Sequence, residues 1–138
     1  MSNILILGGC GFIGESILKK MSDLKLNITV LDKRKKLWPE SYSNSKIKFI
    51  NCNIKNIEKY TYVLEKTNVI IDCIGRTQHS FESEKNIKKD INENFLNKIS
   101  MLLYLSSVKR KIDYISLGTL YKYGNIKSIE NFRKKNKF

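Results

Sequence analysis

The feature that most constrains the fold is a glycine-rich turn that interrupts an apolar run near the start of the chain. The run Asn3-Ile-Leu-Ile-Leu leads into Gly8-Gly-Cys-Gly11-Phe-Ile-Gly14, and a helix-like segment covers residues 12–22. Glycines at this spacing let the backbone turn sharply, approach a pyrophosphate and pack a helix against a strand, while the helix start presents free N–H groups to the anion. The pattern therefore predicts a strand, turn and helix that bind a nucleotide, with the following contact residues: Gly8, Gly11, Phe12, Ile13 and Gly14.

An acidic residue ends the next expected strand. Asp32 closes the run Ile28-Thr-Val-Leu-Asp and lies 18 residues after Gly14. A carboxylate in this place accepts hydrogen bonds from the ribose hydroxyls of a dinucleotide and repels a 2′-phosphate, so Asp32 favours NAD over NADP. Lys33 and Arg34 follow directly and could neutralise a phosphate, which leaves NADP open as the less favoured cofactor. The alternative is an ordinary βαβ unit whose glycines serve only a tight turn.

Short apolar or β-branched runs alternate with helix-like segments along the 138 residues. We expect strands at residues 3–8, 27–32, 46–51, 69–74 and 112–116, and helices near residues 12–22, 56–66, 84–109 and 123–135. Right-handed crossovers between parallel strands give the order 3-2-1-4-5, with a ligand crevice at the carboxyl ends of strands 1 and 4. The expected fold is α/β: a single Rossmann-like, three-layer αβα domain over residues 1–138.

The long expected helix carries apolar residues at helical spacing. They are Ile87, Ile91, Phe95, Ile99, Leu102 and Leu105. Such a stripe predicts a face that packs into the core, with a helix-pairing surface as the second interpretation.

The net charge of +13 would suit a nucleic acid or an anionic membrane as partner. The lysines are spread along the chain, however, so we expect nonspecific attraction of anions, with no specific nucleic acid and no membrane partner. Cys10, Cys52 and Cys73 are odd in number and lack metal-ligand spacing, which predicts free thiols and no metal site. The first apolar run is too short for a signal peptide or a membrane span, so we expect a cytoplasmic protein.

The glycine loop resembles the nucleotide-binding loop of the extended short-chain dehydrogenases/reductases, the family of NAD-dependent sugar-nucleotide epimerases and dehydratases. Three later segments agree with that family in order. Asn53-Ile54 looks like its Asp-Ile/Val adenine-contact motif, with Asn in place of Asp. Ile74-Gly75-Arg76 looks like the end of strand 4, where two small residues line the cofactor, with a bulkier Ile first. The segment around Asn94 resembles a helix motif with a central Asn.

Three departures accompany this resemblance: the Asn at position 53, the bulkier Ile74 at the end of strand 4, and Asn97 where the helix motif has Gly. An Asn can still bond adenine. The resemblance and the motifs together imply the following cofactor-binding residues: Gly8, Gly11, Phe12, Ile13, Gly14, Asp32, Lys33, Asn53, Ile54, Ile74, Gly75, Arg76 and Asn94.

The chemistry of the family rests on a Ser or Thr after strand 5 and a Tyr-x-x-x-Lys pair on the next helix. The i, i+4 spacing places both side chains of the pair on one helix face, where the ammonium lowers the pKa of the tyrosine. The tyrosine is then the general base on a sugar hydroxyl during hydride transfer. Ser116, Tyr123 and Lys127 are the candidates here, and the six residues between Ser116 and Tyr123 suffice for a short βα connection.

A rival alignment sets Thr119-Leu-Tyr121 against the family's Val-Tyr-Gly motif, which directly follows strand 5. The catalytic tyrosine would then lie beyond this chain. Both alignments stay open at the level of the sequence.

Three functions follow from these patterns. The first is hydride transfer between NAD and a hydroxyl-bearing carbon of a nucleotide sugar, the substrate that the resemblance implies. The second is a noncatalytic NAD(P)-binding module, whether truncated, split or NmrA-like, because we expect the family's C-terminal sugar-binding region to be absent. The open edge of strand 5 would then pair with a second copy or with a complementary C-terminal chain. The third and least favoured is nucleic-acid binding through charge.

Overall fold

The sheet of this protein has five parallel strands, as the alternating pattern predicts. In the computed structural model, which describes residues 2–34, 46–75 and 84–117, the strand order is β3-β2-β1-β4-β5. The strands are β1 (Asn3–Leu7), β2 (Asn27–Asp32), β3 (Lys46–Asn51), β4 (Val69–Asp72) and β5 (Asp113–Ser116). The predicted order is confirmed.

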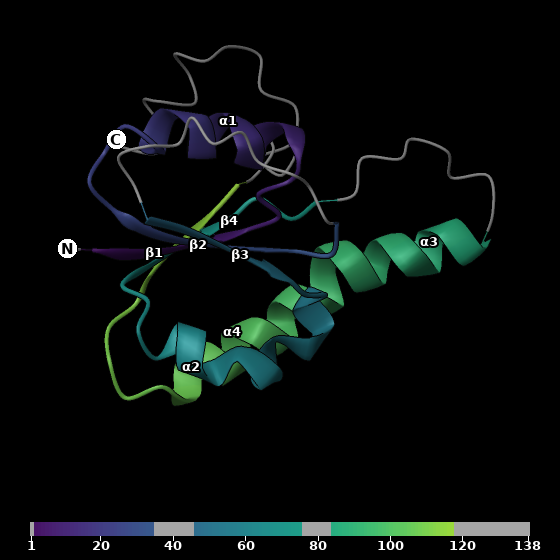
Figure 1. Cartoon of the computed structure of the whole chain (residues 1–138). Helices are drawn as coiled ribbons and strands as arrows, with labels where there is room; N and C mark the ends of the chain where they lie inside the picture. The colour runs from purple at the N-terminus through teal and green to yellow at the C-terminus, as the bar shows by residue number, and fades with distance from the viewer. Residues whose placement is uncertain (1, 35–45, 76–83, 118–138) are drawn as a thin grey trace, which may run out of the picture.

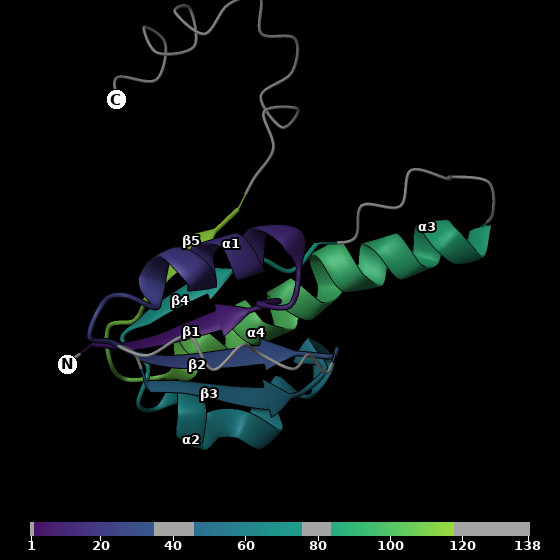
Figure 2. The same cartoon turned by 45° about the horizontal axis from the view of Figure 1, so that its top comes forward.

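Helices cover both faces of the sheet (Figure 1). On one face lies α1 (Phe12–Met21), and on the other lie the 3-10 helix η1 (Ile54–Tyr60), α2 (Thr61–Leu64) and α4 (Asn97–Ser107). A continuous helical stretch leads into α4 from α3 (Glu84–Ile91) through the π-helix η2 (Asn92–Leu96). In both views α3 projects past the end of the sheet (Figure 2). The three-layer αβα architecture is confirmed.

The alternation of side chains along each strand divides the core in two. One cluster joins the sheet to η1, α2 and α4: Leu5, Leu7, Leu31, Cys52, Ile54, Ile57, Val63, Leu64, Ile70 and Met101. The other joins the sheet to α1: Ile4, Ile6, Leu18, Ile28, Val30 and Ile71. Because both faces are covered, the central strands are apolar on both sides, which explains their nearly unbroken apolar runs.

The expected core stripe of the long helix is wrong for most of its length. Of the six residues, five are exposed: Ile87, Ile91, Phe95, Ile99 and Leu102. Leu105 packs partly buried against the core, and the fully buried residue of α4 is Met101. The prediction assumed one uniform helical period, but the wider turn of the π-helix changes the phase between α3 and α4. In addition, α3 extends past the sheet that would have covered it.

The remaining differences concern boundaries. The strand expected to end at residue 74 ends at Asp72, and the helix expected from residue 56 begins two residues earlier as a 3-10 helix, capped by the Asn53 side chain. The helix expected at residues 123–135 lies outside the described residues. Within the described ranges, no helix has both the length and the apolar character needed to cross a membrane.

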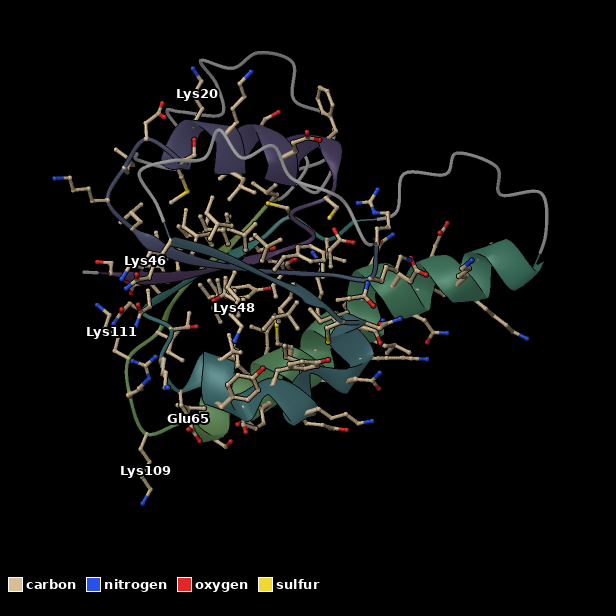
Figure 3. The ribbon with its side chains drawn as sticks, in the orientation of Figure 1. Lys20, Lys46, Lys48, Glu65, Lys109 and Lys111 are labelled. Carbon is tan, nitrogen blue, oxygen red and sulfur yellow. The ribbon has the colours of Figure 1, made fainter. Side chains whose placement is uncertain are left out.

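Exposed lysines lie on several elements of the structure. Lys20 lies on α1, Lys46 and Lys48 on β3, and Lys109 and Lys111 precede β5 (Figure 3). The positive charge is therefore distributed over several faces of the described structure, as the spread of lysines along the sequence predicts.

Candidate nucleotide-binding site

A cavity of about 620 Å³ lies at the carboxyl ends of the strands. Its wall is built from the turns after β1, β2, β3 and β4, from the start of α1, from η1 and η2, and from the residues that begin α4 and follow β5. Most of the predicted cofactor residues line it: Gly8, Gly11, Phe12, Ile13, Asp32, Lys33, Asn53, Ile54, Ile74 and Gly75. The fold thus gathers residues from four separate turns around one space.

Other predicted residues lie elsewhere. Gly14 is buried in α1 beneath the loop and is not part of the wall. Asn94 is exposed on η2, whereas its neighbours Glu93 and Asn97 line the cavity. Arg76, Thr119, Tyr121, Tyr123 and Lys127 lie outside the described residues.

The glycine loop connects β1 to the start of α1. Gly8 has a φ of +74°, a left-handed conformation that glycine adopts without strain, and its N–H donates to the Leu31 carbonyl at 2.8 Å. A Cβ on Gly14 would collide with the Gly8 carbonyl oxygen, so this glycine permits close packing of helix against loop. The first bond of α1 runs from Glu15 N to Gly11 O at 2.8 Å. The preceding N–H groups, at the cavity, form the end of the helix that attracts anions.

Asp32 is almost completely buried at the end of β2, with an exposed fraction of 5%. Its Oδ2 accepts from the Cys10 N–H at 2.9 Å, and its Oδ1 accepts from the Arg34 N–H at 2.8 Å. The Arg34 guanidinium contributes two longer contacts, of 3.4 and 3.5 Å. The short bonds fix the carboxylate against the glycine loop. A carboxylate accepts about four hydrogen bonds, so the hydroxyls of a ligand would have to replace the two longer contacts from the Arg34 guanidinium.

The turn after β3 and the turn after β4 complete opposite parts of the wall. The Asn53 side chain accepts from the Lys55 N–H at 3.2 Å and caps η1, which holds it at the cavity beside the buried Ile54. A Cβ built on Gly75 would meet no atom of the described residues within 4 Å, so with respect to them this residue faces open space. Ile74 lies against the glycine loop, because its Cγ1 would be 3.1 Å from a Cβ on Gly8.

A buried carboxylate that the sequence analysis did not identify supports this wall. Asp72 ends β4 with no exposed surface, and its Oδ1 accepts from the Ile74 N–H at 2.9 Å. Its Oδ2 accepts from the Tyr114 hydroxyl at 2.6 Å and lies 2.9 Å from Lys98 Nζ. Burial raises the pKa of Tyr114, as does its hydrogen bond to Asp72. Tyr114 is therefore a neutral donor, and the cluster ties β4, α4 and β5 together.

Two of the three cysteines lie in the cavity wall, and all three are free thiols, as predicted. Burial is the main cause that raises the pKa of Cys52 and also that of Cys73. Both thiols are therefore in the protonated, weakly nucleophilic form at neutral pH. Among the described residues, no group of three or more His, Cys, Asp or Glu side chains could hold a metal ion.

Ser116, the catalytic candidate within the described residues, is the last residue of β5 and pairs in register with Asp72. Its neighbour Leu117 lines the cavity and donates its N–H to the Asp72 carbonyl at 3.3 Å. Ser116 is exposed and is not itself part of the wall.

Several residues of the wall were missed at the level of the sequence. They are Leu7, Leu31, Cys52, Ile57, Cys73, Glu93, Asn97 and Leu117. A usable signal existed for those that end or directly follow a strand, because these positions meet at the carboxyl edge of a parallel sheet. No comparable signal marks Glu93, whose place depends on the π-helix.

The model of the NAD dependent epimerase/dehydratase family matches residues 4–137. No curated protein matched the sequence.

Solved structures with the same fold include a short chain dehydrogenase from Leptospira borgpetersenii serovar Hardjo-bovis with bound NAD+, at 19% identity and a TM-score of 0.72, over 94% of this chain and 55% of that chain. UDP-glucuronic acid 4-epimerase from Bacillus cereus, in complex with UDP-glucuronic acid and NAD, has 19% identity and a TM-score of 0.74, over 91% and 43%. dTDP-glucose 4,6-dehydratase from Bacillus anthracis, in complex with NAD, has 21% identity and a TM-score of 0.70, over 93% and 41%.

This chain spans about half the length of these solved chains or less. At such identities the likeness shows the fold, whereas the family model covers nearly all of the sequence. The chain belongs to the NAD-dependent epimerase/dehydratase family.

Proposed function

We propose that this protein binds NAD in the cavity at the carboxyl edge of its sheet. The observation that carries the proposal is that the α1 N-terminus and the Asp32 carboxylate line the same cavity, which has a volume of about 620 Å³. A helix start attracts a pyrophosphate, and an acid at the end of the second strand accepts bonds from ribose hydroxyls. The NAD bound in the similar solved structures supports the same cofactor.

Residues of the wall would contact the pyrophosphate, the ribose and the adenine of such a ligand. The loop from Gly8 to the start of α1 would hold the pyrophosphate, and Asp32 the adenosine ribose. Asn53 and Ile54 would contact the adenine, leaving the open space at Gly75 for the other end of the cofactor. NAD, when bound, supplies the acceptor and donor of a hydride.

The reaction we propose is the family's hydride transfer between NAD and a hydroxyl-bearing carbon of a nucleotide sugar. Ser116 would orient the substrate oxygen, Tyr123 would take the hydroxyl proton, and Lys127 would lower the pKa of that tyrosine. The family assignment supports this chemistry, as does the UDP-glucuronic acid of one similar structure. Free thiols favour a reducing compartment, and we infer a cytoplasmic location from them.

Calorimetric titration with NAD tests the binding step separately from catalysis. Gly11→Asp places a carboxylate where the pyrophosphate would lie, yet Gly11 caps α1 with an extended backbone that Asp adopts readily. We expect the wild type to bind and this variant to lose at least about tenfold in affinity, because like charges then meet at the loop. Ser106→Asp adds the same charge at the exposed end of α4 and should bind as the wild type does. Equal NAD affinity in all three proteins would overturn the proposal.

A further inference from the structure

Four basic residues follow Asp32 in the sequence, and the two of them that the structure describes would, taken alone, make the ribose end of the cavity attractive to a 2′-phosphate. Both Lys33 and Arg34 line the cavity. A lysine or arginine beside the ribose acid is the kind of group that accommodates such a phosphate. Among the described residues, the preference of the site for one dinucleotide therefore depends on what these two cations contact.

The structure pairs Lys33 with a carboxylate that arrives from a distant element. The Lys33 Nζ lies 3.1 Å from both carboxylate oxygens of Glu93 on η2, 60 residues further along the chain. The Glu93 side chain is 26% exposed and the Lys33 side chain 54%, and both residues line the cavity. The ion pair thus connects the turn after β2 to the π-helix across the wall of the cavity.

The other cation, Arg34, also contacts a carboxylate. The Arg34 guanidinium contacts Asp32 at 3.4 and 3.5 Å. The formal charges of Asp32, Lys33, Arg34 and Glu93 therefore sum to zero, whereas without Glu93 the same group would carry one net positive charge. Glu93 thus determines whether this group of four side chains is neutral or positively charged.

We propose that Glu93 is a specificity-determining residue that makes the cavity favour a dinucleotide with free ribose hydroxyls over one with a 2′-phosphate. This inference rests on the proposed function. Glu93 acts in two ways: its carboxylate occupies Lys33, and it places a second negative charge near the ribose acid. A phosphate monoester carries about 1.5 to 2 negative charges at neutral pH, so both effects oppose its entry.

A merely structural role for the pair makes a different prediction. If the ion pair served only to attach η2 to the sheet, its loss would weaken the binding of NAD and of NADP to the same extent. An exposed pair of this kind contributes at most about 1 kcal/mol to stability, so a variant that lacks it should remain folded. The ratio of NADP to NAD affinity is therefore the informative readout.

The experiment measures the dissociation constants of NAD and NADP by calorimetry at low salt, where charge effects are least screened. For Glu93→Gln we expect the ratio of NADP to NAD affinity to rise roughly tenfold, because Lys33 is released to contact the phosphate. The double variant with Lys33→Gln should lose most of that rise. Glu58→Gln removes an exposed carboxylate of η1 that does not line the cavity, and it should keep the wild-type ratio.

The outcomes separate this inference from the proposed function. A wild type that binds NAD, together with an unchanged ratio in Glu93→Gln, overturns the role of Glu93 and leaves NAD binding intact. A wild type that prefers NADP overturns the role of Glu93 as well. A wild type that binds neither nucleotide overturns the proposed function itself.

Discussion

At the scale of single residues, the buried carboxylate of Asp72 organises the part of the wall that lies against the glycine loop. Its three partners come from three elements, and one of them, the Ile74 N–H, belongs to the turn that faces Gly8. A buried charge is tolerated only when paired and hydrogen-bonded, so these contacts depend on one another. The sequence marks Asp72 only as an acid at the end of a strand.

Removal of the Tyr114 hydroxyl tests how much this cluster stabilises the fold. Tyr114→Phe keeps the ring but removes the donor of the 2.6 Å bond, and we expect a loss of about 1–3 kcal/mol in the free energy of unfolding. Urea unfolding followed by circular dichroism measures it. Tyr62→Phe, at an exposed tyrosine of α2, should change stability by less than about 0.5 kcal/mol.

The stability that the Tyr114 hydroxyl contributes should also depend on pH. The folded state raises the pKa of Tyr114, chiefly through burial and then through Asp72. The neutral phenol is therefore stabilised by folding, and its contribution is complete below the ordinary tyrosine pKa of about 10 and is lost as the pH rises beyond it. The stability difference between wild type and Tyr114→Phe should shrink under alkaline conditions. A difference that grows with pH would contradict this account of the bond.

At the scale of elements, the π-helix η2 determines which residues of the long helical stretch reach the cavity and which reach the core. Glu93 and Asn97 meet the cavity, and Met101 is fully buried one turn later. A uniform helical period predicts a different set. No residue in the segment Asn92–Leu96 signals a wider turn by itself, which is why the apolar stripe was assigned wrongly.

Substitution within α4 tests the observed phase directly. Met101 is fully buried among residues of the sheet, η1 and α2, so Met101→Ala should reduce the free energy of unfolding by about 2–5 kcal/mol. Leu103, two residues along the same helix, is 66% exposed, and Leu103→Ala should cost less than about 1 kcal/mol. Urea unfolding of both variants provides the comparison. If Leu103→Ala lost more free energy of unfolding than Met101→Ala, a different face of α4 would pack against the core, which would contradict the observed phase.

At the scale of the whole molecule, the order of the sheet and the place of the cavity could be predicted from local signals. The apolar runs define five strands, right-handed crossovers order them, and the turn at Gly8 with the acid at Asp32 marks the edge of the sheet where the cavity lies. The Lys33–Glu93 pair could not be predicted in this way, since it joins residues 60 positions apart through the phase of a helix.

The molecule also has surfaces that bear on its partners. Within the described residues, β5 forms the edge of the sheet and pairs with β4 alone, while the α3–α4 stretch exposes much of its apolar stripe. Open edges and apolar faces favour association. Pairing with a second copy or with a complementary chain stays a prediction.

Site mapping by nuclear magnetic resonance tests the central claim most directly. On titration of isotope-labelled protein with NAD, we expect saturable shifts of the backbone amides of Gly8, Gly11, Asp32, Asn53 and Gly75, which line the one cavity. The amides of Lys46, Lys109 and Lys111, at the opposite end of the sheet, should stay unchanged (Figure 3). Shifts that follow the exposed lysines and vanish with added salt would instead show nonspecific attraction of an anion, and would contradict a nucleotide site at the glycine loop.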